Sequence, residues 1–222
     1  MKLNKKKVFS LALVALLIAT ISFGTLAWFS DSDETTNTFY VATSEDDSAD
    51  DIFSVNVYED VDTDNDGTLE KEDDEGAEFS DILPGQKIVK KPYVENTGRY
   101  DQWVRLTITF ESQDAWYRVN GGKPIDLLTL DPDFNSNWVG DSYSAENGAY
   151  TYVYYSRNPL GAGETLPTFT QVNIPTNLTQ QDMFAIKSLD LTVKAEAVQV
   201  DNLGVNTAKE AFALVEADQA IG

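Results

Sequence analysis

The 222-residue chain contains neither cysteine nor histidine. Without cysteine no disulfide bond can form, so the stability of the fold must come from the apolar core, from hydrogen bonds, or from a metal held by oxygen ligands. The two absences also exclude Ser-His-Asp and Cys-His catalysis, zinc sites of the HExxH type and structural zinc fingers. We therefore expect a protein that is not an enzyme.

Basic residues are scarce, with 16 lysines and arginines against 37 aspartates and glutamates, which gives a net charge of −21. A surface of this sign repels nucleic acids and anionic lipids, and it favours cations. We therefore expect no nucleic-acid partner.

The longest apolar run covers residues 8–23, and four lysines lie among the seven residues before it. The small residues of Thr25-Leu26-Ala27 follow, at the positions that a signal peptidase reads. We interpret residues 1–27 as a signal peptide cleaved between Ala27 and Trp28. This predicts a secreted protein of the extracellular or cell-surface matrix, held at the membrane only before cleavage.

A retained membrane anchor is the alternative, because the apolar run approaches the roughly 17–25 residues that span a bilayer. Cleavage would remove the four lysines and no acidic residue. The mature chain would then have 12 basic and 37 acidic side chains, a net charge of −25.

Residues 28–51 combine a few large apolar residues with serine, threonine and acidic residues, and we interpret them as an extended N-terminal arm. The domain proper is predicted over residues 52–222, where apolar and polar residues alternate with a period of two, as in half-buried antiparallel strands. Turn sequences rich in glycine, proline and asparagine separate the strands. This pattern predicts an all-β, jelly-roll-like β-sandwich. The expected strands lie at residues 53–58, 87–95, 104–111, 115–119, 149–156, 168–174 and 189–197.

Two segments have a helical pattern instead. Residues 125–130 are expected to form a short helical turn. Residues 207–220 place Ala208, Ala211, Phe212 and Val215 on one side, which predicts an amphipathic C-terminal helix capped by Asn206 or Thr207.

An acidic loop over residues 60–76 contains a twelve-residue calcium-binding pattern. A tight turn at Gly67 would direct three carboxylates to one point, and a backbone carbonyl would complete the set. The last position is aspartate instead of the usual glutamate, and a strand precedes the loop, so no helix-loop-helix hand is expected. We predict a structural calcium ion, with a solvated acidic hairpin as the alternative. The predicted ligands are Asp62, Asp64, Asp66, Thr68 and Asp73.

Three parts of the chain together resemble the camelysin/TasA family of exported biofilm matrix proteins. The first is the signal boundary from Gly24 to Asp31. The second is Leu83-Pro84-Gly85-Gln86-Lys87 with the later Val94-Glu95-Asn96-Thr97-Gly98. The third comprises the tyrosine-rich segment 150–155, the turn 159–165 and the late strand 193–199. The acidic loop and the C-terminal helix do not correspond to features of the best-known fibre members, so the resemblance is to the family and not to one member.

The resemblance implies a jelly-roll subunit that is processed by a dedicated signal peptidase and assembles with copies of itself or related subunits. In this family an N-terminal strand freed by cleavage inserts into the sheet of the next subunit, a form of strand addition. The resemblance would make Phe39 and Val41 the residues that face the neighbour's groove, with Trp28 and Phe29 as anchors. The arm could also be a tail or fold back on its own domain.

Two other functions stay open at this point. Exposed aromatic residues would make the chain an extracellular module that binds carbohydrate or a surface partner, although aromatic residues in a sandwich more often pack in the core. The candidates are Trp116, Tyr117, Trp138 and Tyr143. A camelysin-like metalloprotease is disfavoured, because a hydrolytic zinc site normally uses histidine.

Overall fold

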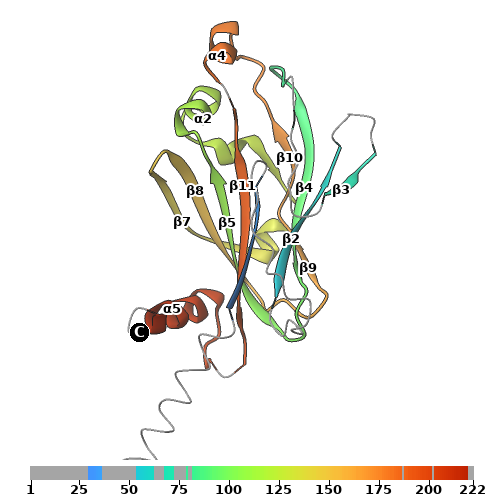
Figure 1. The fold of residues 1–222 in the computed structure, drawn as a ribbon, viewed down its shortest axis with the longest axis vertical. Coiled ribbons are helices and arrows are strands. Elements are labelled where there is room, and N and C mark those ends of the chain that lie inside the picture. Colours follow the sequence, from blue (N-terminus) through green and yellow to red (C-terminus); the bar gives the residue numbers. More distant parts are fainter. Residues whose placement is uncertain are drawn as a thin grey trace, which may run out of the picture.

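A computed structural model describes residues 30–36, 54–62, 68–72, 79, 82–186, 188–201 and 203–219 of the chain. Its strands form two antiparallel sheets that pack face to face (Figure 1). The first sheet has the order β1 (Ser30–Thr36), β11 (Leu191–Gln199), β5 (Gln102–Phe110), β8 (Ala149–Ser156) and β7 (Trp138–Glu146). The second has the order β3 (Glu70–Glu72), β2 (Val55–Val61), β4 (Lys87–Asn96), β10 (Phe169–Asn173) and β6 (Leu128–Leu130), with β9 (Thr165–Pro167) also paired to β4.

The core lies between the sheets and is formed by alternate residues of each strand. On β5, Val104, Leu106, Ile108 and Phe110 are fully buried, while the residues between them are partly exposed. Strand β2 shows the same alternation over its seven residues. The predicted all-β sandwich is therefore confirmed, and its cause is the period-two pattern that gives each strand one apolar face.

The helices are short and lie at the ends and edges of the sandwich (Figure 1). The predicted turn at 125–130 is a 3-10 helix that begins one residue earlier and gives way to β6. The helices are α2 (Gln113–Asn120), η2 (Pro124–Leu127), α3 (Phe134–Asn137), α4 (Gln180–Ala185) and α5 (Ala208–Gln219).

The strand predicted at residues 115–119 is wrong, because this segment is helix α2. Trp116 and Val119 are both buried, and their spacing of three places them on one face of a helix. Gly121 then ends the helix with φ of 61°, a left-handed conformation that glycine adopts without steric cost. A segment this short fits the period of a strand as well as that of a helix. The glycine at its C-terminal end favours the helix, because it can adopt the left-handed conformation that ends one.

The predicted C-terminal helix is confirmed as α5, which packs on the outer face of the first sheet. Thr207 caps it, since the backbone N–H of Glu210 donates to Thr207 Oγ1 at 3.3 Å. The helix has a small apolar core of its own, separate from the core between the sheets. Its buried members are Trp103, Val198, Ala208, Ala211, Phe212 and Val215.

Arg105 on β5 links helix α5 to the first sheet by hydrogen bonds. Its Nε donates to Glu196 Oε2 on β11 at 2.8 Å, and its Nη1 donates to Glu216 of the helix. The guanidinium also lies 4.6 Å from the ring centre of Phe212. Burial opposes the charge of Arg105, but the hydrogen bonds to the two glutamates outweigh it and raise the pKa of this side chain.

Candidate functional site

The N-terminal arm contributes strand β1, which lies at an edge of the first sheet. It pairs antiparallel with β11 of the same chain, in a register that runs from Ser30 opposite Val198 to Thr36 opposite Thr192. No described strand pairs with the other side of β1. The arm is thus extended as expected over these seven residues, and here it pairs within its own domain.

The residues predicted to act in strand donation fall on either side of β1. Trp28 and Phe29 precede it, and Phe39 and Val41 follow it; all four lie outside the described residues, as does the cleavage site after Ala27. The sequence prediction singled out the apolar residues of the arm and did not identify the polar Ser30–Thr36 as the paired segment. The only sequence signal for this strand was its position within the predicted extended arm.

Strand β11 is the partner that β1 covers. On its other side β11 pairs with β5 over nine residues, from Leu191 opposite Phe110 to Gln199 opposite Gln102. Seven of its nine residues are buried, among them Val193, Ala195 and Ala197 of the core. Without β1, the outer row of backbone N–H and C=O groups of β11 would be open for another strand.

The opposite edge of the same sheet is strand β7. From Val139 to Glu146 every residue of this strand is exposed, and a register shift interrupts its pairing with β8 between Gly140 and Ser142. Lys209 of α5 forms an ion pair with Asp141 on this edge. A bulge and charged side chains are features that keep an edge strand from pairing with another chain.

The predicted calcium loop connects β2 to β3, which form an antiparallel hairpin with Val61 opposite Glu70. Asp62 is mostly buried at the end of β2, and its backbone N–H donates to the carbonyl of Val89 at 3.4 Å. Thr68 is exposed at the other end of the loop. The strand-loop-strand setting agrees with the expectation that no helix-loop-helix hand forms.

Three of the five predicted calcium ligands, Asp64, Asp66 and Asp73, lie outside the described residues. In the part of the chain that the structure describes, no three acidic side chains converge on a point that could hold a metal ion. The structure thus places Asp62 and Thr68 at the two ends of one loop. Calcium binding by this loop stays a prediction.

The segment 94–98 and the turn 159–165, both part of the family resemblance, are in contact through Asn96. Its Nδ2 donates to the carbonyls of Leu160 at 2.7 Å and Tyr100 at 2.9 Å, and its Oδ1 accepts from Gly98 N–H and Gln102 Nε2. The side chain is fully buried. Asn96 therefore fixes the turn from β4 to β5 and, through Leu160, the loop from β8 to β9.

The Leu83-Pro84-Gly85 turn precedes β4, at the end of that strand remote from Asn96. Gly85 has φ of 83°, and its N–H lies 3.0 Å from the carbonyl of Ile174. A Cβ at Gly85 would come within 3.0 Å of the Thr176 side chain. Both the backbone angle and the close approach require glycine here.

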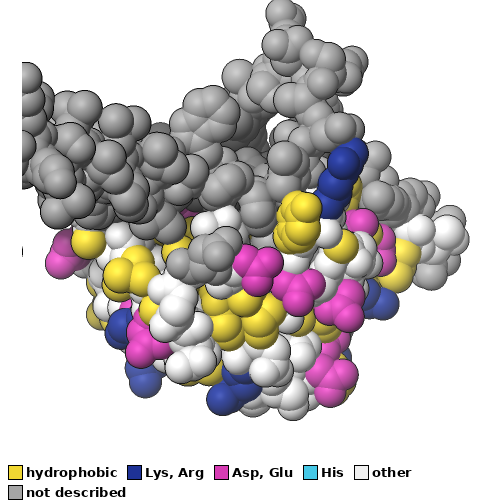
Figure 2. Space-filling model, turned by 90° about the horizontal axis from the view of Figure 1, so that it is seen from below, with side chains coloured by type: hydrophobic (Ala, Val, Ile, Leu, Met, Phe, Trp, Pro, Cys, Tyr) yellow, Lys and Arg dark blue, Asp and Glu magenta, His cyan; other side chains and the backbone are white. Residues whose placement is uncertain are grey.

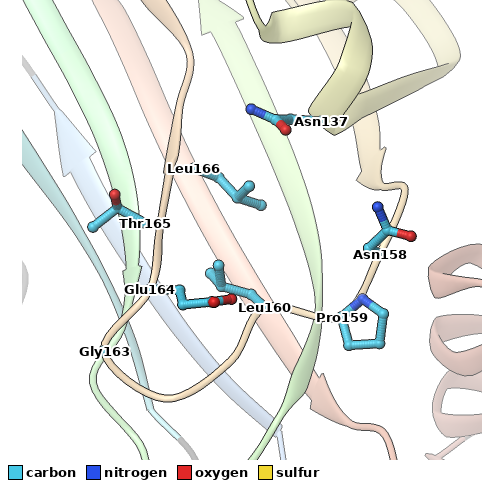
Figure 3. A pocket seen from close by; sticks show the side chains of 8 residues that line it. All are labelled: Asn137, Asn158, Pro159, Leu160, Gly163, Glu164, Thr165 and Leu166. Atoms are coloured by element: carbon cyan, nitrogen blue, oxygen red, sulfur yellow. The ribbon is translucent and has the colours of Figure 1, made fainter.

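An open groove of about 470 Å³ lies beside the β8–β9 loop (Figure 3). Its lining includes Asn137, Asn158, Leu160 and Glu164. The Glu164 carboxylate accepts the backbone N–H of Gly161 at 2.9 Å, so its role is to hold the loop. The groove therefore contains a structural carboxylate and two amides, and these residues do not form an acid-base pair.

The four aromatic residues considered for surface binding divide into two pairs. Trp116 and Trp138 are each only 2% exposed, and their indole N–H groups donate to the carbonyls of Asp190 and Pro167. Both are core residues, so the structure corrects the expectation that they could be exposed. Tyr117 and Tyr143 are 61% and 52% exposed.

The two exposed tyrosines lie beside one turn. Tyr143 Oη donates to the carbonyl of Gly122 at 3.4 Å, and the position of a Cβ on Gly122 would be 3.4 Å from the ring of Tyr117. The Tyr143 ring also packs on Tyr150 and Tyr152, with ring centres 6.3 and 4.9 Å away. The turn after α2 thus brings an aromatic patch to the surface.

No protein-family model matches the sequence, and the comparison with curated proteins finds no match. Among the described residues, no helix combines the length and the apolar character needed to cross a membrane. A function is therefore inferred from the fold and from the edge strands of the first sheet.

Proposed function

We propose that the chain is an exported structural protein of the extracellular or biofilm matrix, and that its copies assemble into fibres by exchanging strand β1. The observation that carries this proposal is the place of β1 in the fold. It forms an edge of the sheet, it pairs with β11 alone among the described strands, and it begins at the third residue after Ala27.

The composition of β1 favours exchange. Its sequence, Ser-Asp-Ser-Asp-Glu-Thr-Thr, contains no apolar residue, and its backbone pairs with β11 along all seven residues. Such edge segments open at a lower free energy than the core strands. The same segment of a second copy would form the same hydrogen bonds, so exchange between copies costs little.

The chain between β1 and β2 gives the arm its reach. Residues 37–54 separate the two strands, and a segment of this length spans up to about 60 Å when extended. That distance exceeds the width of one sandwich. A copy could therefore keep its domain folded while its β1 pairs with β11 of a neighbour.

The net negative charge of the mature chains opposes their association, and a bound calcium ion would reduce this repulsion. Copies with a net charge of −25 repel each other, and β1 itself carries Asp31, Asp33 and Glu34. Several acidic side chains also lie beside hydrophobic side chains on the face of the molecule seen in Figure 2. A divalent ion in the acidic hairpin would lower this repulsion and stiffen the connection between β2 and β3.

The resemblance to the camelysin/TasA family supports the same function. Signal cleavage, an N-terminal strand that pairs in trans and a role in a biofilm matrix are what that family implies. Two of the resembling stretches are in contact, since Asn96 Nδ2 donates to the carbonyl of Leu160.

The engineered pair Glu34→Cys and Lys194→Cys tests strand exchange, since Glu34 lies opposite Lys194 in the register and the chain has no other cysteine. Two single-cysteine proteins, one with each change and both beginning at Trp28, are mixed and treated with a short thiol cross-linker. Exchange predicts a covalent dimer of the two proteins. The double variant, diluted before cross-linking, is the control for pairing within one chain.

Two outcomes of this experiment are decisive. A mixed dimer that appears together with fibres in electron micrographs supports exchange of β1. If fibres form and only the double variant cross-links within its own chain, β1 does not exchange and the proposed assembly is wrong.

A binding module for carbohydrate is the second candidate, and the exposed patch of Tyr117 and Tyr143 favours it. Stacked aromatic rings beside polar groups suit the apolar faces of sugars. Titration with matrix polysaccharide would test it, with Tyr143→Ala as the binding variant and the buried Trp138 left intact. Equal affinity of the two proteins would count against this function.

A further inference from the structure

A lysine and a glutamate are buried together in the interior of the sandwich. Glu59 on β2 and Lys90 on β4 are 0% and 1% exposed, and Lys90 Nζ donates a hydrogen bond to Glu59 Oε2. Lys90 is among the largest fully buried side chains in the described chain. Charged residues in such a position are rare and call for a specific reason.

The register of the strands explains how the two residues meet. Glu59 lies opposite Pro92, and Val61 lies opposite Lys90, so Glu59 and Lys90 are diagonal neighbours on one face. That face also carries Val55 and Val57, both fully buried. Strand β2 further packs against β1 and β11 of the other sheet, which closes the site toward the first sheet.

The surroundings disfavour a permanent ion pair. Glu59 Oε1 is buried and has no hydrogen-bond partner among the described residues. Desolvation lowers the pKa of Lys90, although the charge and hydrogen bond of Glu59 act in the opposite direction. A buried pair with an unsatisfied carboxylate oxygen is poorly compensated for its loss of hydration, and burial disfavours the charged form of Lys90.

We propose that Lys90 and Glu59 condense to form an intramolecular isopeptide bond. After proton transfer, the neutral amine of Lys90 has a lone pair beside the carboxylic acid of Glu59. Nζ attacks Cδ of Glu59, a C–N bond forms, and the C–O bond of the tetrahedral intermediate breaks. The hydroxyl group leaves as water with a proton from the attacking nitrogen.

The reaction is balanced without any further reactant. One ammonium and one carboxylate become one amide and one water molecule, with no change in oxidation state. The step removes both buried charges, and the oxygen that remains on Glu59 is that of a neutral amide. Escape of the water from an apolar interior favours the amide, because the reverse reaction needs water at the same site.

The bond would serve as the covalent link that a cysteine-free chain lacks. It would join β2 to β4 and close a loop that contains the acidic hairpin and the Leu83-Pro84-Gly85 turn. A closed loop restricts the unfolded chain and so raises resistance to denaturation. This inference does not rest on strand exchange, since both reacting residues lie on β2 and β4, and β1 only packs against β2 from the other sheet.

Mass spectrometry of the purified, denatured protein tests the proposal. We expect an intact mass lower by one water than the sequence requires. The Asp66-Gly67 sequence could also lose water by closing to a succinimide, so the mass alone is not sufficient. Tandem spectra of a proteolytic digest should contain one branched peptide in which the Lys90 side chain is joined to the Glu59 side chain.

The double variant Glu59→Leu with Lys90→Met is the matched control. It replaces the pair by apolar side chains of similar size and leaves no unpaired charge, so it should fold. Its denatured mass should equal its sequence mass, and no branched peptide should appear. Folded wild-type protein that yields separate, unmodified Glu59 and Lys90 peptides would overturn the proposal, whatever the variant does.

Discussion

The two edges of the first sheet are built in different ways. Strand β7 is exposed from Val139 to Glu146, but it carries a register shift, it belongs to a hairpin with β8, and Lys209 of α5 forms an ion pair with its Asp141. Strand β1 pairs regularly along all seven residues with β11, from which it is far removed in sequence. The β7 edge is protected by local structure, whereas the edge of β11 is covered, among the described strands, by Ser30–Thr36 from the N-terminal part of the sequence. The comparison favours β1 over β7 as the edge for the proposed exchange between copies.

Removal of residues 28–36 should have the largest effect, because it opens the edge of β11 and deletes the strand that would be donated. We expect complete loss of fibres, with a soluble or irregularly aggregated protein in their place. Electron microscopy and light scattering measure this. The variant Tyr143→Ala on β7 is the matched control, and it should assemble like the wild type. Normal fibres from the truncated protein would remove β1 from the assembly mechanism.

Calcium should produce the next largest effect if the hairpin between β2 and β3 binds it. At about a hundred times its dissociation constant, calcium would add about 2.7 kcal/mol to the free energy of unfolding. Calorimetric titration of the wild type, Asp64→Ala and Asp66→Ala measures the binding. Loss of the heat in both variants is expected. Equal heats in all three proteins would show that the loop is a solvated hairpin, and charge repulsion at the β1 edge would then not depend on calcium bound there.

Arg105→Ala should weaken the attachment of helix α5 to the first sheet, where Arg105 links the helix to β5 and β11. Loss of the two charged hydrogen bonds and of the contact with Phe212 is expected to cost about 1–3 kcal/mol in the free energy of unfolding. Arg105→Lys keeps the charge and should lose less. Urea denaturation of the three proteins measures the difference, and equal midpoints for wild type and Arg105→Ala would contradict it.

The same contact predicts a dependence on pH. Burial alone would raise the pKa of Glu196, but the hydrogen bond from Arg105 and its charge outweigh burial and lower the pKa below its usual 4.5. A group whose pKa is lowered on folding contributes stability above its unfolded pKa, and this contribution is lost as the pH falls through the folded value. The wild type should therefore lose stability below about pH 4.5 more steeply than Arg105→Ala.

The sequence predicted the parts of the fold that depend on burial. Strands β5, β8 and β11 alternate clearly, because each has one face in the core, and their positions agree with the prediction. Strand β7 was not predicted, because only Trp138 is buried and the rest of the strand is held by its pairing with β8. Strand β1 was predicted only as part of an extended arm, since its partner lies more than 150 residues away.

The buried pair of Glu59 and Lys90 shows a second limit of sequence reading. Glu59 occupies a core position of β2 by its alternation with Val57 and Val61, but charge normally places a residue on the surface. Only the register between β2 and β4 brings its partner to the same face. The two residues are 31 positions apart, and no local pattern connects them.

Lys209→Met is expected to have the smallest effect, because it breaks an ion pair on the surface between α5 and β7. Such pairs contribute little to global stability, so the midpoint of urea denaturation should stay unchanged. The local effect should be measurable, since Asp141 would lose the cation that holds β7 against the helix. Hydrogen exchange of β7 amides should become faster than in the wild type, while exchange in β5 stays the same. Faster exchange together with new dimers would show that β7 is also an edge able to pair, which would remove the difference between the two edges.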